Sequence, residues 1–362
     1  MKRITIVAGA RPNFVKVAPL IRAIEKTDGA SYLLVYAGRE DDPPLEASIF
    51  DDLQMPRPTV FLGVDSTSLN EITSRVMAEF DALLERQPTN VVIVVDDLAS
   101  TMAAAIVTKK RGLRLAHLVA GTRSFDMNMP KEVNRLVIDA LSDYLFTAGV
   151  KSNSVATREQ ASLVEGGRLN VEGGTYMVGN ILMDTLRFNH QRLSKPDIDI
   201  EEGNYLVFTL NRKALLADEE KLNQLLAAMT QAAGGTPIIA PLRGLAAEKV
   251  ASLRLPLSAI RQINPLPYLE FGWLTAHAKG IITDSGNVAE EATFNGVPCI
   301  TLNSYTEHQE TVSVGSNVLV GEDPQRLSDE VSRMVRGEWK QSALPDRWDG
   351  RTAERIVQIL MQ

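Results

Sequence analysis

A strand–helix–strand pattern occupies residues 279–302, whose sequence is KGIITDSGNVAEEATFNGVPCITL. The apolar run KGIITDSG at 279–286 predicts a buried strand, and VPCITL at 297–302 predicts a second one. The segment 284–298 has Ser285 as a residue suited to a helix N-cap and predicts a helix. Two strands joined by a helix form a βαβ unit, which predicts a parallel α/β sheet.

The same alternation extends along the whole chain. Other strands are predicted at 4–9, 31–38, 90–95, 114–120, 144–149, 204–211 and 236–242. Helices are predicted at 15–26, 70–87, 218–232 and 268–278. The pattern therefore predicts two Rossmann-like, doubly wound α/β domains, 1–172 and 173–345, joined near 173–180 or through the polar, proline-containing stretch 193–203.

Composition excludes several classes of function. A formal net charge of -7 over 362 residues argues against generic binding to nucleic acid or to an anionic membrane surface. The one cysteine, Cys299, excludes an intrachain disulfide and a cysteine-ligated zinc site, and its apolar neighbours predict that it is buried. Four scattered histidines form no metal-ligand cluster. Neither a signal-peptide core nor a membrane-length apolar run is present, so a cytoplasmic protein is predicted.

Residues 117–143 have the sequence HLVAGTRSFDMNMPKEVNRLVIDALSD. This segment resembles HVEAGxRSFDxxMPEEINRxxxDxxSD of the non-hydrolysing UDP-N-acetylglucosamine 2-epimerases. Arg123 and Arg135 stand where that family has arginines, and they are expected to support the binding cleft. The resemblance covers essentially the full chain and includes the Gly179-Asn180 and Asp184-Thr185 pairs of a GNxLxDT-like motif.

The resemblance implies a fold and a reaction. The fold would be of the GT-B type, with two Rossmann-like domains facing a cleft that binds a UDP-sugar, and with a C-terminal helix at 346–362 joining the first domain. The family reaction inverts C2 of UDP-N-acetylglucosamine by eliminating UDP and adding it back to the other face, which gives the manno epimer. It requires no metal or nicotinamide, so no cofactor is expected. The family generally forms dimers, so a homodimer is expected.

The nucleotide end of the family site is recognisable. Ser285, Gly286 and Asn287 would offer backbone N–H groups to a phosphate at a helix N-terminus, and Glu290 would accept hydrogen bonds from a ribose. The family has TDSGGxxEEAxxxGxPxxxL here, so Asn287 replaces a glycine. An ordinary helix cap by Ser285 is the alternative interpretation.

Two cations follow the first strand in AGARPNFVKVAPL at 8–20, which is similar to the family pattern xGxRPxxxKxAPL. Arg11 is expected to pair with a phosphate, and Lys16 is expected to act in proton transfer. The alternatives are a loop salt bridge for Arg11 and a solvated helix face for Lys16.

The proton-transfer positions are only partly retained. Asp97 matches the aspartate of the family pattern VxGDxxSTxAAA, while Asp96 replaces its glycine. Two adjacent carboxylates facing one cleft would raise the pKa of one of them. Val119 and Lys131 replace two glutamates, and Glu132 cannot stand in for the second because it lies about 100° around a helix.

Three further positions lack the histidines of the family patterns. Asn211 replaces the histidine of TLHR, Arg39 that of TGxHxD, and Arg243 that of PxHP. An amide of similar size does not titrate near neutral pH, so Asn211 cannot serve as an acid or base there.

Two hypotheses follow. The first is an enzyme of this family whose activity on UDP-N-acetylglucosamine or a related UDP-sugar is impaired or altered. The second is a catalytically inactive UDP-sugar-binding or scaffold paralogue that pairs with an active epimerase. An unrelated two-domain glycosyltransferase is disfavoured by the RSFD and MPKEVNR matches.

Overall fold

The chain forms two compact units in a computed structural model that describes residues 1–42, 45, 47–165, 173–253 and 260–362. The first unit comprises Met1–Phe188 and Asp346–Gln362, and the second comprises Asn189–Pro345. The predicted domain boundary between residues 172 and 173 therefore differs from the observed division. Residues 166–172 lie outside the described part, but the strand and helix that follow them belong to the first unit.

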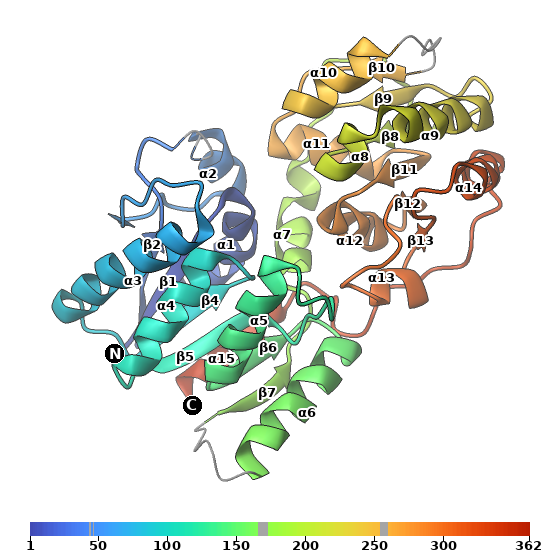
Figure 1. The fold of residues 1–362 in the computed structure, drawn as a ribbon. Helices are drawn as coiled ribbons and strands as arrows, with labels where there is room; N and C mark the ends of the chain where they lie inside the picture. Colours follow the sequence, from blue (N-terminus) through green and yellow to red (C-terminus); the bar gives the residue numbers. More distant parts are fainter. Residues whose placement is uncertain (43–44, 46, 166–172, 254–259) are drawn as a thin grey trace. The chain divides into compact units, whose positions relative to one another are not determined.

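The first unit alternates strands and helices (Figure 1). Its strands are β1 (Lys2–Ala8), β2 (Ala30–Tyr36), β3 (Val60–Phe61), β4 (Val91–Val95), β5 (Arg114–Ala120), β6 (Tyr144–Thr147) and β7 (Gly174–Met177). Its helices are α1 (Arg11–Glu25), α2 (Ala47–Leu53), α3 (Leu69–Arg86), α4 (Ala99–Lys110), α5 (Pro130–Leu141), α6 (Val150–Glu165), α7 (Ile181–Asn189), which ends at the division, and α15 (Thr352–Met361).

All seven described strands of this unit form one parallel sheet in the order β3-β2-β1-β4-β5-β6-β7. The order reverses between β1 and β4, so the chain leaves these neighbouring strands in opposite directions. Every residue of β4 is buried, as expected for a parallel strand covered on both faces. The carboxyl ends of β1 and β4 lie at the position where open α/β sheets place their ligands.

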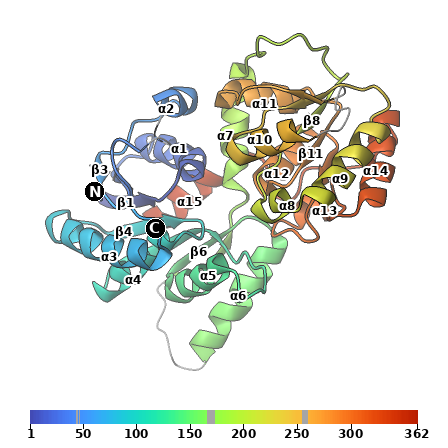
Figure 2. The ribbon, with the colours of Figure 1, turned by 45° about the horizontal axis from the view of Figure 1, so that its top comes forward.

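The C-terminal helix α15 belongs to the first unit and packs against α1 (Figure 2). The Asp184 carboxylate accepts hydrogen bonds from Thr352 N (3.0 Å) and Ala353 N (3.1 Å), and so caps the first turn of α15. Burial, partly offset by these hydrogen bonds, raises the pKa of Asp184 to about 6. The aspartate of the GNxLxDT-like motif therefore holds the start of the C-terminal helix against the first unit.

The second unit repeats the alternation. Its strands are β8 (Leu206–Phe208), β9 (Ile238–Ala240), β10 (Ile260–Gln262), β11 (Gly280–Thr283), β12 (Cys299–Thr301) and β13 (Asn317–Leu319). Its helices are the 3-10 helix η2 (His190–Arg192), α8 (Lys213–Ala217), α9 (Glu219–Ala232), α10 (Gly244–Ser252), α11 (Tyr268–Ala276), α12 (Gly286–Asn295), α13 (Glu310–Ser313) and α14 (Pro324–Arg336).

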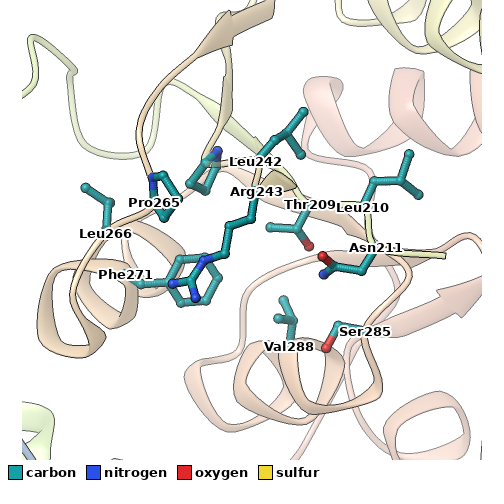
Figure 3. Close-up of a pocket in the computed structure, with 11 residues that line it drawn as sticks. Thr209, Leu210, Asn211, Leu242, Arg243, Pro265, Leu266, Phe271, Ser285 and Val288 are labelled. Carbon is teal, nitrogen blue, oxygen red and sulfur yellow. The ribbon is translucent and has the colours of Figure 1, made fainter. Parts of the chain in front are cut away.

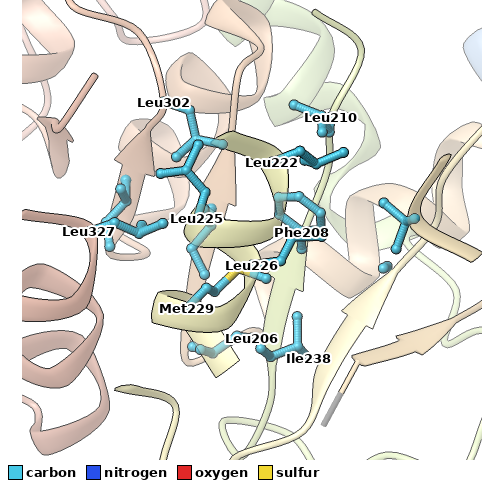
Figure 4. Close-up of a cluster of buried hydrophobic side chains, with 14 of the residues drawn as sticks. Leu206, Phe208, Leu210, Leu222, Leu225, Leu226, Met229, Ile238, Leu302 and Leu327 are labelled. Carbon is cyan, nitrogen blue, oxygen red and sulfur yellow. The ribbon is translucent and has the colours of Figure 1, made fainter. Parts of the chain in front are cut away.

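The six described strands of the second unit are also parallel, in the order β10-β9-β8-β11-β12-β13, and this order reverses between β8 and β11. One face of the sheet is covered by α9 and α14, whose apolar side chains form one cluster with Leu206 and Phe208 of β8 (Figure 4). Leu206, Phe208, Leu222 and Leu226 are each at most 1% exposed there. This packing fixes the β8 and β11 ends that carry the site.

The predicted fold class is confirmed, with two Rossmann-like parallel α/β units. Cys299 is buried, as predicted. No helix of the described chain is long and apolar enough to cross a membrane. Within the same residues, no group of three or more histidine, cysteine or acidic side chains could hold a metal ion.

Candidate functional site

Lys16 and Asp96 form an ion pair in the first unit, where β1 and β4 end. Lys16 Nζ donates to Asp96 Oδ1 at 2.5 Å, and Asn13 Nδ2 donates to Asp96 Oδ2 at 2.8 Å. Lys16 is 7% exposed, so its interpretation as part of a solvated helix face is wrong. The α1 face that carries Asn13 and Lys16 is turned toward the loop after β4.

Asp97 has different partners. Arg135 donates to Asp97 Oδ2 through Nε (2.9 Å) and Nη2 (2.5 Å), and Lys131 Nζ lies 3.5 Å from Oδ1. Burial alone would raise the pKa of Asp97, but the positive charges of Arg135, Lys131 and Lys16 outweigh it and hold that pKa below its ordinary value. The predicted crowding of Asp96 and Asp97 is therefore wrong for Asp97, because each carboxylate has its own cation.

A buried histidine fixes the loop that carries both aspartates. His117 Nδ1 lies 2.5 Å from Asp139 Oδ1, and His117 Nε2 lies 3.0 Å from the backbone oxygen of Asp96. Both partners are acceptors, because Arg123 and Gly121 N already donate to the Asp139 carboxylate at 2.7 and 3.0 Å. His117 therefore links the Asp139 carboxylate to the backbone of the loop that carries Asp96. Arg123 also pairs with Glu159, so it supports the site from behind.

Glu132 holds the loop before α5 and does not face the aspartates. Its carboxylate accepts hydrogen bonds from Ser124 N (2.9 Å), Ser124 Oγ (2.9 Å) and Phe125 N (3.0 Å). Burial would raise the pKa of Glu132, but these donors and Arg135 lower it. Its exclusion as a substitute for a glutamate at position 131 agrees with this geometry.

The second unit has an open pocket of about 300 Å³ at the carboxyl ends of β8, β9 and β10 and beside α12 (Figure 3). Its apolar part includes Pro265, Leu266 and Phe271, and its polar part includes Asn211, Arg243 and Ser285, all shown in Figure 3. One apolar wall and a few polar groups are typical of a pocket for a small molecule.

The loops around this pocket are tied together by Asp284, which follows β11. Asp284 Oδ2 accepts hydrogen bonds from the backbone N–H groups of Asn211 (2.7 Å) and Arg212 (2.6 Å). Ser285 occupies the N-cap position of α12, but its side chain makes no capping hydrogen bond. The interpretation of Ser285 as an ordinary side-chain cap is therefore wrong, and its hydroxyl lines the pocket.

Glu290 lies one turn inside α12, as predicted, and its carboxylate lies 3.1 Å from His308 Nδ1. The sequence interpretation missed His308. A side chain at Gly286 would start 3.8 Å from His308 Cδ2, the ring atom bonded to Nε2, so the imidazole lies beside the first turn of α12. Glu291, also missed, is buried, and burial followed by the nearby Glu290 raises its pKa to about 8.

Comparison with known proteins identifies the family of the chain. The family model described as UDP-N-acetylglucosamine 2-epimerase matches residues 22–361. The chain belongs to the UDP-N-acetylglucosamine 2-epimerase family. The resemblance seen in the 117–143 segment is thereby confirmed.

Two curated members of the epimerase family are close to this chain. The UDP-N-acetylglucosamine 2-epimerase of Methanocaldococcus jannaschii is 30% identical over 374 residues, covering 99% of this chain and 98% of the relative. The UDP-2,3-diacetamido-2,3-dideoxy-D-glucuronate 2-epimerase of Pseudomonas aeruginosa is 31% identical over 327 residues, covering 89% and 88%.

The crystal structure of the M. jannaschii epimerase in complex with UDP-GlcNAc and UDP superimposes with a TM-score of 0.84 at 30% identity, covering 99% of each chain. The expected GT-B-type fold is therefore confirmed.

The remaining predicted site residues are placed as follows in this epimerase-family chain. Arg11 is the first residue of α1, and its side chain makes no hydrogen bond or ion pair with any other described residue, so the loop salt bridge considered as an alternative is not found in that part of the chain. Arg39 is exposed and pairs with Asp41 and Asp65. Val119 lies at an irregularity of β5 with φ +73°, a left-handed conformation that is strained for a β-branched residue.

Proposed function

We propose that the chain binds UDP-N-acetylglucosamine or a related UDP-sugar, with the UDP moiety in the pocket of the second unit, and that its epimerisation at C2 is impaired or altered. The main observation behind this proposal is that pocket. It is open, and its lining includes Ser285, the N-cap residue of α12, whose side chain makes no capping hydrogen bond. The 30% identical M. jannaschii epimerase, whose structure contains UDP-GlcNAc and UDP, supports the choice of ligand.

The pocket has a part suited to each portion of UDP. The Phe271 ring with Pro265 and Leu266 offers an apolar surface for the uracil. The backbone N–H groups of Gly286 and Asn287 lie in the first turn of α12, where the helix dipole favours a diphosphate. Glu290, one turn further along α12, is the proposed acceptor of hydrogen bonds from the ribose hydroxyls.

One histidine of the second unit is a proposed partner of the diphosphate. His308 in the second unit lies beside Gly286 and is oriented through Nδ1 by Glu290. With Nδ1 facing a carboxylate, a protonated His308 would present Nε2–H to an anion.

The chemistry of the first unit supports the proposed impairment. Epimerisation through UDP elimination needs groups that give and take protons near neutral pH. Val119 has no titratable group, and the Lys131 ammonium lies beside Asp97. The lowered pKa of Asp97 also makes that carboxylate a weak base. Asp97 and Lys16 remain the retained family positions, but both are held in ion pairs.

The alternative is an inactive UDP-sugar-binding or scaffold paralogue, and an exposed apolar patch favours it. Phe125, Met127 and Val133 of the first unit are 72%, 63% and 40% exposed. These side chains lie on α5 and on the loop that precedes it, and exposed apolar groups on adjoining segments often mark a protein contact. Under this alternative the patch would contact a second copy or an active paralogue. Light scattering of Phe125→Ser/Met127→Ser should then show a lower oligomeric mass than the parent protein.

Proton NMR with UDP-N-acetylglucosamine in deuterated buffer tests the proposal. Broadening of the uridine signals with slow or absent deuterium incorporation at C2 is the expected result. Phe271→Ala should weaken UDP binding about tenfold, whereas Phe188→Ala, a matched control in the first unit, should not. Absence of any uridine response would contradict the ligand assignment, and rapid exchange at C2 would contradict impairment.

A reversion experiment tests which residues cause the loss. Val119→Glu, Lys131→Glu and Asn211→His in one chain should raise the rate of C2 deuterium incorporation, because together they restore three titratable groups. The parent chain measured at the same occupancy is the control. No increase in a folded triple variant would place the cause elsewhere.

A further inference from the structure

The Asp96 carboxylate occupies a cradle made by α1. Each of its two oxygens receives a hydrogen bond from a different side chain, Oδ1 from Lys16 at 2.5 Å and Oδ2 from Asn13 at 2.8 Å. An ammonium and an amide N–H donating to the two oxygens of one carboxylate form a site for any small oxyanion. Here the protein's own side chain is the occupant.

The donors of this cradle are held in place without Asp96. Asn13 is 1% exposed, and its Oδ1 accepts hydrogen bonds from Gly9 N (2.9 Å) and Ala10 N (3.1 Å), which turns its Nδ2 toward Asp96. Lys16 lies one turn further along α1 and is buried. A buried ammonium is stabilised by negative partners, and Lys16 has Asp96 at 2.5 Å in addition to the nearby charge of Asp97. Removing the Asp96 carboxylate therefore leaves a donor position that another oxyanion can fill.

The Asp96 side chain is not needed to shape its loop. Asp96 has φ +59°, a left-handed conformation that glycine adopts freely and that aspartate tolerates better than most residues. The backbone oxygen of Asp96 is bound by His117, an interaction that a glycine would keep. The carboxylate can therefore be removed while the loop and the cradle remain.

We propose that Asp96 is a specificity-determining residue whose carboxylate fills an oxyanion site formed by Lys16 and Asn13, and thereby excludes a phosphate or carboxylate group of a ligand from the first unit. Asp96 thus neutralises the cation that the first unit could otherwise offer to a leaving group. Only this consequence for turnover rests on the proposed function, because the site itself is carried by the geometry of α1 and the loop after β4.

Calorimetric titration with inorganic phosphate tests the proposal on the full chain. Asp96→Gly should gain one phosphate site with a Kd on the order of 1 mM, since two hydrogen bonds, one of them charge-assisted, become available. The second unit is the same in every variant, so any phosphate bound there contributes equally and cancels in the comparison. Adding Lys16→Met to Asp96→Gly should abolish the gained site.

Two results would overturn the proposal. The first is equal phosphate binding by the parent chain and Asp96→Gly, and the second is a gained site that survives the loss of Lys16. If Asp96→Gly folds poorly, Asp96→Ser also removes the carboxylate from the cradle, and its phosphate binding is compared with that of the parent chain in the same way. UDP binding measured in parallel separates the failure of this proposal from the failure of the proposed function. A chain that binds no UDP would contradict the proposed function, whereas the difference in phosphate binding between the parent chain and Asp96→Gly would still decide the role of Asp96.

Discussion

The two units place their candidate sites at the same topological position but treat charge differently. In each sheet the strand order reverses between two central strands, β1 and β4 in one and β8 and β11 in the other. In the first unit the cations and carboxylates beyond these strands bind one another. In the second unit a pocket of about 300 Å³ stays open beside the unbonded Ser285 hydroxyl.

An aspartate after the second central strand shows what separates the units. Asp96 follows β4 and binds two side chains of α1, so it consumes polar groups that a ligand could have used. Asp284 follows β11 and binds the backbone N–H groups of Asn211 and Arg212, so it shapes a loop and leaves the Asn211 side chain to the pocket. Both residues are aspartates, so the difference lies in their hydrogen-bond donors. Side-chain donors are occupied at Asp96, whereas backbone donors are occupied at Asp284 and the pocket stays open.

Backbone strain follows the same division. Every described non-glycine residue with a positive φ lies in the first unit: Gln54, Asp96, Val119, Phe125 and Arg347. Asp96 directly follows β4, and Val119 lies at the irregularity of the neighbouring strand β5. Strained backbone often accompanies sites that position side chains, and here Val119 retains the conformation without a titratable side chain.

The largest expected effect comes from breaking the Lys16–Asp96 pair on one side only. Lys16→Met should lower the free energy of unfolding by about 3 kcal/mol, because it leaves a mostly buried carboxylate without its cation. In the Asp96→Gly background the same change should cost much less, which urea unfolding of the four chains would show. If Lys16→Met lowered the free energy of unfolding equally in both backgrounds, the charges of Lys16 and Asp96 would not be coupled. The difference drawn here between the first and second units would then be wrong.

A smaller effect is expected in the second unit, from Glu291. The pKa of Glu291 is raised to about 8, so the folded chain holds a proton that the unfolded chain releases near pH 4.5. The resulting stability is complete below pH 4.5 and is lost as pH rises through 8, with a slope of up to about 1.4 kcal/mol per pH unit. Glu291→Gln should remove this slope from urea unfolding between pH 6 and 8, whereas the exposed control Glu219→Gln should retain it.

The smallest effect concerns strain at Val119. Val119→Gly should raise the free energy of unfolding by about 1 kcal/mol, because glycine adopts φ +73° without a Cβ clash. Thermal unfolding measures the change. Val95→Gly in the neighbouring strand β4 is the matched control and should destabilise, since Val95 is fully buried. A loss of stability in Val119→Gly would show that packing of the valine outweighs the strain.

Elements with a long periodic pattern were predictable from the sequence. The helix expected at 70–87 is observed as α3, and the one expected at 218–232 as α9, with Asp218 as its N-cap. Short strands without a strong apolar run, such as β7 (Gly174–Met177), were not recognised. Because β7 completes the first sheet, the division between the units falls after Phe188 rather than before residue 173.

The positions of site residues were predictable, but their electrostatic state was not. Motif spacing identified Lys16 and Asp97, yet the burial of Lys16 and the direction of the Asp97 pKa shift depend on partners far away in the chain. Asp96 lies 80 residues from Lys16, and no local pattern encodes their pairing. His308 was missed for the same reason, because its neighbour Glu290 belongs to another element.

The return of α15 to the first unit has a consequence for protein synthesis. The second unit is one continuous stretch that ends at Pro345, whereas the first unit lacks a helix until residues 352–361 have been made. On the ribosome, the amino-terminal unit therefore waits for the last segment of the chain, with Asp184 lacking the backbone N–H groups that it caps. The unit that is started first is finished last, and a nascent chain that stops short of residue 352 carries a complete second unit beside an unfinished first one.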